Sequence, residues 1–301
     1  MIVIDIYEKI AKTGVFASWM GIADLHILVD TEDENAYQPL DHKAYEYLKF
    51  CNEELKANPN SFGKIYTYTD GDLTELFRST IRKTKAAYHK NDSRAEDSMH
   101  KKVLNDYVVP KLKVLTRDTT FIGGVAGNHL IEFSQESKGT GYANSEEYII
   151  NRLGGKYAGE GMMLINYHIN LGCQRVLKKI LVTHGAKGGT KTAIIKQLER
   201  LHSMGVRVDC IVVAHAHDPL TGFYSRYDYP DTENQAIKKH DTLVVCLGST
   251  RDGIKKGYDD YCERFMFTPS AGRYPVLVFR ATKRHIDSRG SMDVVIRPYI
   301  M

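Results

Sequence analysis

The sequence predicts an α/β fold in which helices pack outside a sheet-rich centre. In the first half of the 301-residue chain, apolar runs typical of buried strands alternate with amphipathic helical stretches. Strand-like runs dominate the second half, and this distribution is typical of layered α/β architectures. A chain of this length can bury a substantial core. We expect a single domain over residues 1–301, with additions at about 78–118 and 133–160 that shape access to a site.

The first half begins with residues 4–13, which we interpret as a short helix. A mostly apolar run at 15–23 suits a buried strand, and residues 41–56 place apolar side chains at helical spacing. The remaining predicted elements of this half are a short strand at 64–69, a polar and basic helical region from 73 to about 115, and a strand at 119–125.

The second half begins with a short helix, followed by two neighbouring strands. An amphipathic helix and a series of strands complete it. The predicted ranges are a helix at 145–153, strands at 162–170 and 175–183, a helix at 190–204, and strands at 208–213, 242–247, 276–281 and 292–298.

Five of the predicted strands end in side chains that can bind metal. In open α/β sheets, side chains beyond the carboxyl ends of neighbouring strands converge on one crevice. Carboxylate, imidazole and amide oxygen suit a divalent metal. No cysteine belongs to this set of residues, which argues against a structural zinc site. The set is too large for one ion and suits two ions that share a bridging carboxylate. Its members are Asp24 with His26, Asp72, Asn128 with His129, His184, and His215 with His217.

In this order the residues resemble the calcineurin-like metallophosphoesterase superfamily. The matching pieces are Asp24-Leu25-His26, Gly71-Asp72, Gly127-Asn128-His129, His184 and Ala214-His215-Ala216-His217. Each piece alone is weak, but all five in order, each after a predicted strand, form a specific signal. The resemblance implies an αββα sandwich with two central mixed β-sheets and flanking helices.

The resemblance also implies a role for each matching residue. Asp72 would bridge two divalent metal ions, for which Mn is the first choice and Zn, Fe, Ni and Mg are alternatives. His129 would touch the phosphate and act as general acid for the leaving oxygen. A metal-activated hydroxide would attack phosphorus in line, which makes the chain a phosphoric ester hydrolase. One ion would be held by Asp24, His26 and His217, and the other by Asn128, His184 and His215.

Two positions depart from the pattern of the superfamily. Ala214 stands where glycine is usual, and its methyl group is tolerated only if φ there is negative. Leu130 stands where an acidic residue often follows the G-N-H motif. That acidic residue commonly orients the histidine, so the general-acid role of His129 requires another acid, such as Asp24.

Several features bear on the substrate. Between residues 78 and 113, ten Lys and Arg stand against four Asp and Glu, which fits a solvated helical face or contact with phosphates. The second half is similar to calcineurin-like phosphoesterases common in phages and prophages, on residues 153–159, 183–191 and 247–250. An aromatic-rich run at 222–230 either roofs the crevice and stacks a base or forms a hairpin at the sheet rim. These features favour a phosphodiester, in DNA, RNA or a nucleotide.

Alternatives to a phosphodiesterase or nuclease stay open. The first is a phosphomonoesterase, including a protein phosphatase. A non-catalytic binding or assembly protein on the same fold is less favoured because all seven ligand positions are kept. The glycine-rich turn at 184–191 either binds a second phosphate or is a tight turn with Thr190 as N-cap. His168 lies in a predicted strand and could face the site.

Composition excludes several classes of protein. Hydrophobic residues make up 43% and charged residues 26%, and the net charge is +4, all ordinary for a globular protein. No apolar stretch reaches the roughly 18 residues of a membrane-spanning helix, and we expect neither a signal peptide nor a membrane partner. The five cysteines are scattered, which argues against a disulfide framework and predicts a cytoplasmic location. The oligomeric state is not readable.

Overall fold

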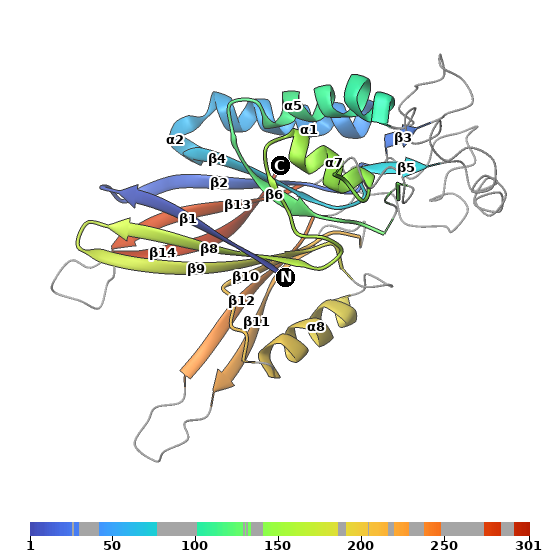
Figure 1. Ribbon diagram of the computed structural model, residues 1–301. Helices are drawn as coiled ribbons and strands as arrows, with labels where there is room; N and C mark the ends of the chain where they lie inside the picture. Colours follow the sequence, from blue (N-terminus) through green and yellow to red (C-terminus); the bar gives the residue numbers. More distant parts are fainter. Residues whose placement is uncertain are drawn as a thin grey trace.

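Four layers make up the part of the chain that the computed structural model describes (Figure 1). Helices α1 (His42–Ala57), α5 (Val109–Thr116) and α7 (Ser145–Arg152) lie on one side of two packed sheets, and helix α8 (Lys191–Ser203) lies on the other. The described residues are 1–25, 27–29, 42–76, 101–128, 130, 132–133, 141–185, 191–203, 205–215, 220–228, 238–247, 274–283 and 292–301.

The first six-stranded sheet has the order β14-β13-β2-β4-β6-β7. Strands β2, β4 and β6 run parallel to one another, β7 continues parallel, and β13 and β14 are antiparallel additions. Their bounds are β2 (Gly14–Ile22), β4 (Lys64–Asp70), β6 (Thr120–Val125), β7 (Lys156–Tyr157), β13 (Pro275–Lys283) and β14 (Met292–Ile300). The carboxyl ends of β2, β4 and β6 therefore meet at one edge.

The second six-stranded sheet has the order β1-β8-β9-β10-β12-β11. Its pairs β1–β8, β9–β10 and β10–β12 are parallel, whereas β8–β9 and β11–β12 are antiparallel. The bounds are β1 (Ile2–Ile10), β8 (Met162–Leu171), β9 (Gln174–Thr183), β10 (Cys210–Val213), β11 (Leu220–Asp228) and β12 (Lys238–Cys246). Both sheets are mixed, so the predicted αββα sandwich is confirmed. A separate pair joins β3 (Ile27–Val29) and β5 (Thr74–Leu76).

An aromatic cluster fills the space between the two sheets. The Trp19 ring from β2 lies 5.1 Å from the Tyr167 ring of β8 and 5.1 Å from the Phe279 ring of β13. Tyr66 of β4 contacts both Trp19 and Tyr167. Each such pair contributes roughly 0.5–1.5 kcal/mol beyond the burial of its area, so the cluster fixes how the sheets face one another.

Helices close the two outer faces by specific contacts. In α1, the Asn52 side-chain amide donates to the Leu115 carbonyl at the end of α5 (2.7 Å). Helix α7 begins with a capping box in which Glu147 N–H donates to the Asn144 side chain and Ala143 N–H donates to the Glu147 carboxylate. On the far side, Leu198 and Leu201 of α8 belong to a second apolar cluster against β10 and β12. No described helix has the length and apolarity needed to cross a lipid bilayer.

Two predicted elements are wrong, and the other predicted helices and strands are found within a few residues of their expected bounds. Residues 4–13 are not helical, because residues 2–10 form strand β1, which pairs in parallel with β8. The helical region predicted from residue 73 instead begins with strand β5. Residues 77–100 lie outside the described part of the chain. Contact between the basic segment at 78–113 and phosphates therefore stays a prediction.

Candidate metal centre

The five strands whose ends carry potential ligands do converge. Asp24 follows β2, Asp72 follows β4 and Asn128 follows β6, all in the first sheet. His184 follows β9 and His215 lies just after β10 in the second sheet. Because β2, β4 and β6 are parallel, and β9 is parallel to β10, these residues lie where the edges of the two sheets meet.

His184 is the centre of this arrangement. Its Nε2 lies 3.0 Å from Asp72 Oδ2 and 3.2 Å from Asn128 Oδ1. Its Nδ1–H donates to the backbone carbonyl of Asp70 at 2.6 Å, which fixes the tautomer and the ring orientation. A histidine held in this way presents Nε2 as a ligand atom, as in metal sites whose histidines are oriented by a carbonyl behind them.

His215 and Asp24 complete the cluster of described residues. One ligand atom each of Asp72, His184 and His215 lie within 4.8 Å of one another. The His184 and His215 rings meet edge to face, with centroids 5.1 Å apart. Asp24 Oδ2 accepts a hydrogen bond from the backbone N–H of His215 at 3.1 Å, so the carboxylate connects the two sheets.

The backbone is strained where these side chains project. Asp24, Asp72 and His215 adopt left-handed conformations, with φ values of 50°, 50° and 64°. Side chains other than glycine rarely adopt this conformation, and each instance costs on the order of 1–3 kcal/mol. A hydrogen bond from Asp24 N–H to the Gly71 carbonyl (3.1 Å) ties two of the strained turns together. Strain concentrated in this way is typical of functional sites.

Two glycines allow the close approach of the segments that follow β4 and β6. A Cβ on Gly127 would lie 1.9 Å from Asp72 Oδ1 and 2.2 Å from Asp72 N. A Cβ on Gly71, whose φ is 81°, would lie 2.6 Å from His184 Nδ1. The contact between the Asp72 turn and the segment before Asn128 therefore requires glycine on both sides.

Acidic side chains are concentrated in the interior around the cluster. Asp24, Asp70, Asp72 and Glu146 are all fully buried. Burial raises the pKa of Asp70 well above its usual range, and Asp24 and Asp72 raise it further while His184 opposes them. Burial likewise raises the pKa of Glu146 to about 8.

The pKa of His184 reflects the negative charge of the aspartates around it. Burial lowers the pKa of the imidazole, but the hydrogen bond to Asp72 and the charges of Asp24, Asp72 and Asp70 outweigh burial and raise it to about 10. A divalent cation would provide the missing positive charge, and the oxygen and nitrogen atoms present are ligands that Mn, Zn, Fe, Ni and Mg accept. The described residues therefore fit a divalent metal.

The structure brings together five of the eight residues predicted from the sequence: Asp24, Asp72, Asn128, His184 and His215. The other three, His26, His129 and His217, lie outside the described residues, as does the glycine-rich turn at 186–190. The assignment of each ligand to one of two ions, and the general-acid role of His129, stay predictions.

Two buried acids near the site were missed in the sequence. Asp70 directly precedes Gly71-Asp72, and only its place at a strand end could have signalled it. Glu146 in α7 accepts a hydrogen bond from the backbone N–H of Leu73 at 2.9 Å, next to Asp72. No local pattern distinguishes Glu146 from Glu147, which caps the helix.

Three open questions from the sequence receive answers. Ala214 is buried and is not among the residues with positive φ, so its methyl group is accommodated. His168 faces away from the site, because its Nε2 bonds Asp5 Oδ1 at 2.9 Å on the outer side of the second sheet. The described part of the aromatic run belongs to β11, which forms a hairpin with β12 at the sheet rim instead of a roof.

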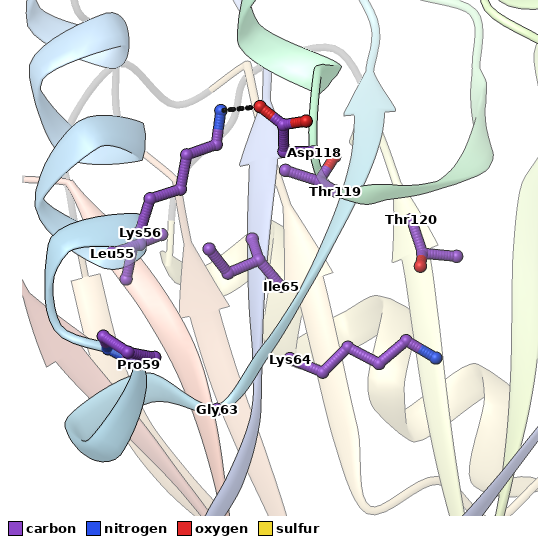
Figure 2. A pocket seen from close by; sticks show the side chains of 9 residues that line it. All are labelled: Leu55, Lys56, Pro59, Gly63, Lys64, Ile65, Asp118, Thr119 and Thr120. Atoms are coloured by element: carbon purple, nitrogen blue, oxygen red, sulfur yellow. Dashed lines mark ion pairs between the residues drawn. The ribbon is translucent and has the colours of Figure 1, made fainter.

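A pocket of about 360 Å³ lies at the opposite end of the first sheet (Figure 2). It is lined by Leu55, Lys56, Pro59, Gly63, Lys64, Ile65, Asp118, Thr119 and Thr120. Lys64 begins β4 and Thr120 begins β6, whereas the metal cluster follows the carboxyl ends of these strands. The seven residues of β4 separate the two regions by about 20 Å, so this pocket is not part of the metal centre.

The similarity found to known proteins is one of structure, at low sequence identity. No family model matches the sequence, and neither does any curated protein. A predicted phosphoesterase from Streptococcus pneumoniae is similar in structure, with 11% sequence identity, 93% of this chain and 98% of that chain covered, and a TM-score of 0.33. A double mutant of Vps29 from Entamoeba histolytica has 13% identity, coverage of 94% and 99%, and a TM-score of 0.34.

The architecture itself agrees with the resemblance seen in the sequence: two packed mixed sheets, flanking helices, and potential metal ligands at the strand ends where the sheets meet. This agreement with calcineurin-like metallophosphoesterases therefore rests on the topology and the site.

Proposed function

We propose that this protein is a dinuclear metal-dependent phosphoesterase that hydrolyses a phosphodiester in nucleic acid or a nucleotide. The observation that carries the proposal is the convergence of buried Asp72 and His184 with Asn128 and His215 from separate strand ends. The proposed ligands are Asp24, His26 and His217 for one ion, Asn128, His184 and His215 for the other, and Asp72 for both. Bound divalent ions would lower the pKa of water and neutralise charge on the phosphoryl oxygens.

The chain's own residues prepare this site before substrate arrives. The Asp70 carbonyl orients His184 from behind, and the Asp24 carboxylate holds the turn at His215 through its backbone N–H. Burial of Asp24, Asp72 and His184 excludes bulk water from one side of the cluster. Asn128 is exposed, so its side of the cluster faces solvent, and a phosphate ester can approach there.

The preference for a diester rests on the sequence. The basic segment at 78–113 and the similarity to phage phosphoesterases support it. The aromatic run no longer contributes, since its described residues form a strand at the sheet rim. A phosphomonoesterase would use the same ligands, so the nature of the ester is the finer part of the proposal.

Hydrolysis of two synthetic esters tests the proposal. Metal-stripped protein would be assayed with bis-p-nitrophenyl phosphate and p-nitrophenyl phosphate after addition of Mn, Ni, Zn, Mg or no metal. We expect metal-dependent turnover, faster with the diester, that is lost in His215→Ala and retained in His168→Ala, a matched histidine on the outer sheet face. Faster turnover of the monoester would overturn the diester preference. No turnover with any metal, despite metal binding, would overturn hydrolysis of simple esters and favour a binding role.

A further inference from the structure

Strand β1 forms one margin of the second sheet, and its charged residues are its only protection of the kinds usual for an edge strand. It pairs with β8 along all nine residues without a bulge, and no described element pairs with its other side. Exposed edges are normally blunted by proline, bulges, short length or charged side chains, because they are ready to pair with another chain, and a partner strand of complementary charge is not repelled by the last of these. By comparison, the margin strand β14 contains Pro298, and β7 has only two residues.

The side chains of β1 alternate strictly between the two faces. Ile4 faces the core and is 6% exposed. Val3, Asp5, Tyr7 and Lys9 are exposed on the outer face, with Val3 at 45% and Tyr7 at 68%. A long edge strand that carries an exposed aromatic residue between an acid and a base is suited to pairing with a strand of complementary charge.

The strand is complementary to itself in one register. When two copies pair antiparallel about a twofold axis perpendicular to the sheet, one residue lies opposite its own copy. With Tyr7 at the axis, Asp5 of each copy lies opposite Lys9 of the other. An axis at Asp5 or at Glu8 would place like charges opposite one another, which is destabilising. An axis at Ile6 would leave Lys9 opposite Val3.

We propose that β1 is an interaction surface for a second copy of this chain, which pairs antiparallel about Tyr7 and continues the sheet across a twofold axis. Two Asp5–Lys9 pairs and a Tyr7–Tyr7 contact would set the register. Backbone hydrogen bonds along the paired edges would provide affinity, as in other complexes formed by strand addition.

The outer face of β1 is already ordered for this contact. Asp5 Oδ1 accepts from the Asn166 amide at 3.1 Å and bonds His168 Nε2 at 2.9 Å. The hydrogen bond to His168 is also the main reason that the pKa of Asp5 is lowered, which keeps the carboxylate charged. Tyr7 stacks on His168 with ring centroids 4.7 Å apart and an interplanar angle of 9°. Ordered side chains lose less entropy on binding.

The surface is distant from the metal centre, so association and hydrolysis can be tested separately. Tyr7 pairs with His168, which in turn pairs with Leu177 of β9. Leu177 precedes His184 by seven residues along an extended strand, a distance of about 23 Å. Variants of β1 should therefore retain the wild-type turnover of a phosphodiester, and failure of the dimer would leave the proposed function untouched.

Disulfide trapping tests the register directly. In a background with Cys173→Ser and Cys262→Ser, which removes the exposed thiol among the described residues and the one that lies outside them, Tyr7→Cys would place two thiols opposite one another. Directly opposed residues have Cα atoms about 4.5–5.5 Å apart, within the range of a disulfide. We expect a covalent dimer of Tyr7→Cys under mild oxidation and none of the matched control Val3→Cys, which lies near the end of the paired segment. Equal trapping of both variants would contradict the register, and trapping of neither would contradict the dimer.

Charge reversal tests whether the partner is a second copy of this chain. Sedimentation of the full chain across the micromolar range should show a dimer that Asp5→Lys and Lys9→Asp each weaken at least about tenfold, since each places like charges opposite one another. The double variant should recover dimerisation, with circular dichroism confirming that every variant is folded. A monomeric wild-type chain, or a double variant no better than the single ones, would overturn the proposal.

Discussion

Two aspartates with similar positive φ angles lie near opposite ends of strands in the first sheet. Asp72 has a φ of 50° after β4, and Asp118 has a φ of 60° before β6. Asp72 is fully buried among other acids, whereas Asp118 is exposed beside Lys56, 3.9 Å away, and Arg117. Figure 2 shows the Lys56–Asp118 pair at the pocket.

The hydrogen bonding of polar side chains also differs between the two regions. At the pocket, Thr119 Oγ1 lies 2.8 Å from Thr67 Oγ1 and donates to the Thr116 carbonyl, so its hydrogen bonds are made within the protein. At the metal centre, both carboxylate oxygens of Asp70 are buried and have no hydrogen-bond partner among the described residues. Backbone strain alone thus does not mark a site. Strain at a cluster of buried acids does, because burying several carboxyl groups together is costly without a ligand.

The largest expected effect distinguishes the two aspartates directly. Asp72→Asn keeps the shape of the side chain but removes the charge that two ions would share. We expect diester turnover to fall by on the order of 10²–10³-fold or more, as for removal of a major electrostatic group. Asp118→Asn is the matched control, and it should leave turnover unchanged. Similar activities for the two variants would refute the difference drawn between the two ends.

Substitution of Gly127 tests the close approach of the strand ends. Gly127→Ala would place a methyl group against Asp72 Oδ1, so the turn must move. We expect destabilisation of about 1–3 kcal/mol, as for overpacking elsewhere, together with weakened metal binding. Gly161→Ala, where a Cβ would meet nothing closer than 4.0 Å, is the control for thermal unfolding and metal titration. Unchanged metal affinity in Gly127→Ala would show that the approach is unimportant.

Glu146 supports the Asp72 turn through Leu73 N–H, so its acceptor oxygen matters more than its charge. Glu146→Gln retains an acceptor and should bind metal nearly as well as wild type. Glu146→Ala should lose about 10–100-fold in metal affinity, as for other partners that orient ligands. Calorimetric titration measures the metal affinity of each variant. Equal affinities would show that Glu146 does not support the Asp72 turn.

The raised pKa of Glu146 also predicts a pH dependence of the metal-free protein. The pKa rises from 4.5 in the unfolded chain to about 8 in the folded one, so the folded state binds the proton more tightly between these values. The stabilising contribution is full below pH 4.5 and is lost as the pH rises through about 8. Thermal unfolding should show this loss, and Glu146→Gln should flatten it. An equal slope in both proteins would contradict the assignment.

The smallest effect is expected at the pocket. Lys56→Ala removes an ion pair with an exposed partner, and such pairs contribute about 0–1 kcal/mol. Stability in chemical denaturation should change within that range, and diester turnover should not change. A loss of turnover would show that the two ends of the sheet are coupled.

Much of the site could be predicted because its residues follow strands that are readable locally. Asp24, Asp72 and His184 each come within two residues of the end of a strand-like run, and parallel strands bring such ends together. The prediction of a helix at the β1 segment is wrong although isoleucines recur there at period two, at Ile2, Ile4, Ile6 and Ile10. Its charges resemble the polar face of a helix, and its partner β8 lies about 160 positions further along the chain.

Glu146 could not be predicted for a different reason. Its role depends on the packing of α7 against the segment after Asp72, a contact between residues 73 positions apart. Neither the helical period nor the capping box indicates which acid of α7 is buried. Non-local contacts of this kind are decided by tertiary packing, and a single sequence does not encode them in a local pattern.

Binding of metal to the stripped protein tests the central claim most directly. We predict that calorimetric titration with Mn²⁺ shows two ions bound per chain, and that Asp72→Asn abolishes the tight sites while Asp118→Asn retains them. The wild-type thermal midpoint should rise with added metal, since the ion binds only the folded state. Weak binding that is the same in wild type, Asp72→Asn and Asp118→Asn would contradict a metal centre at the strand ends.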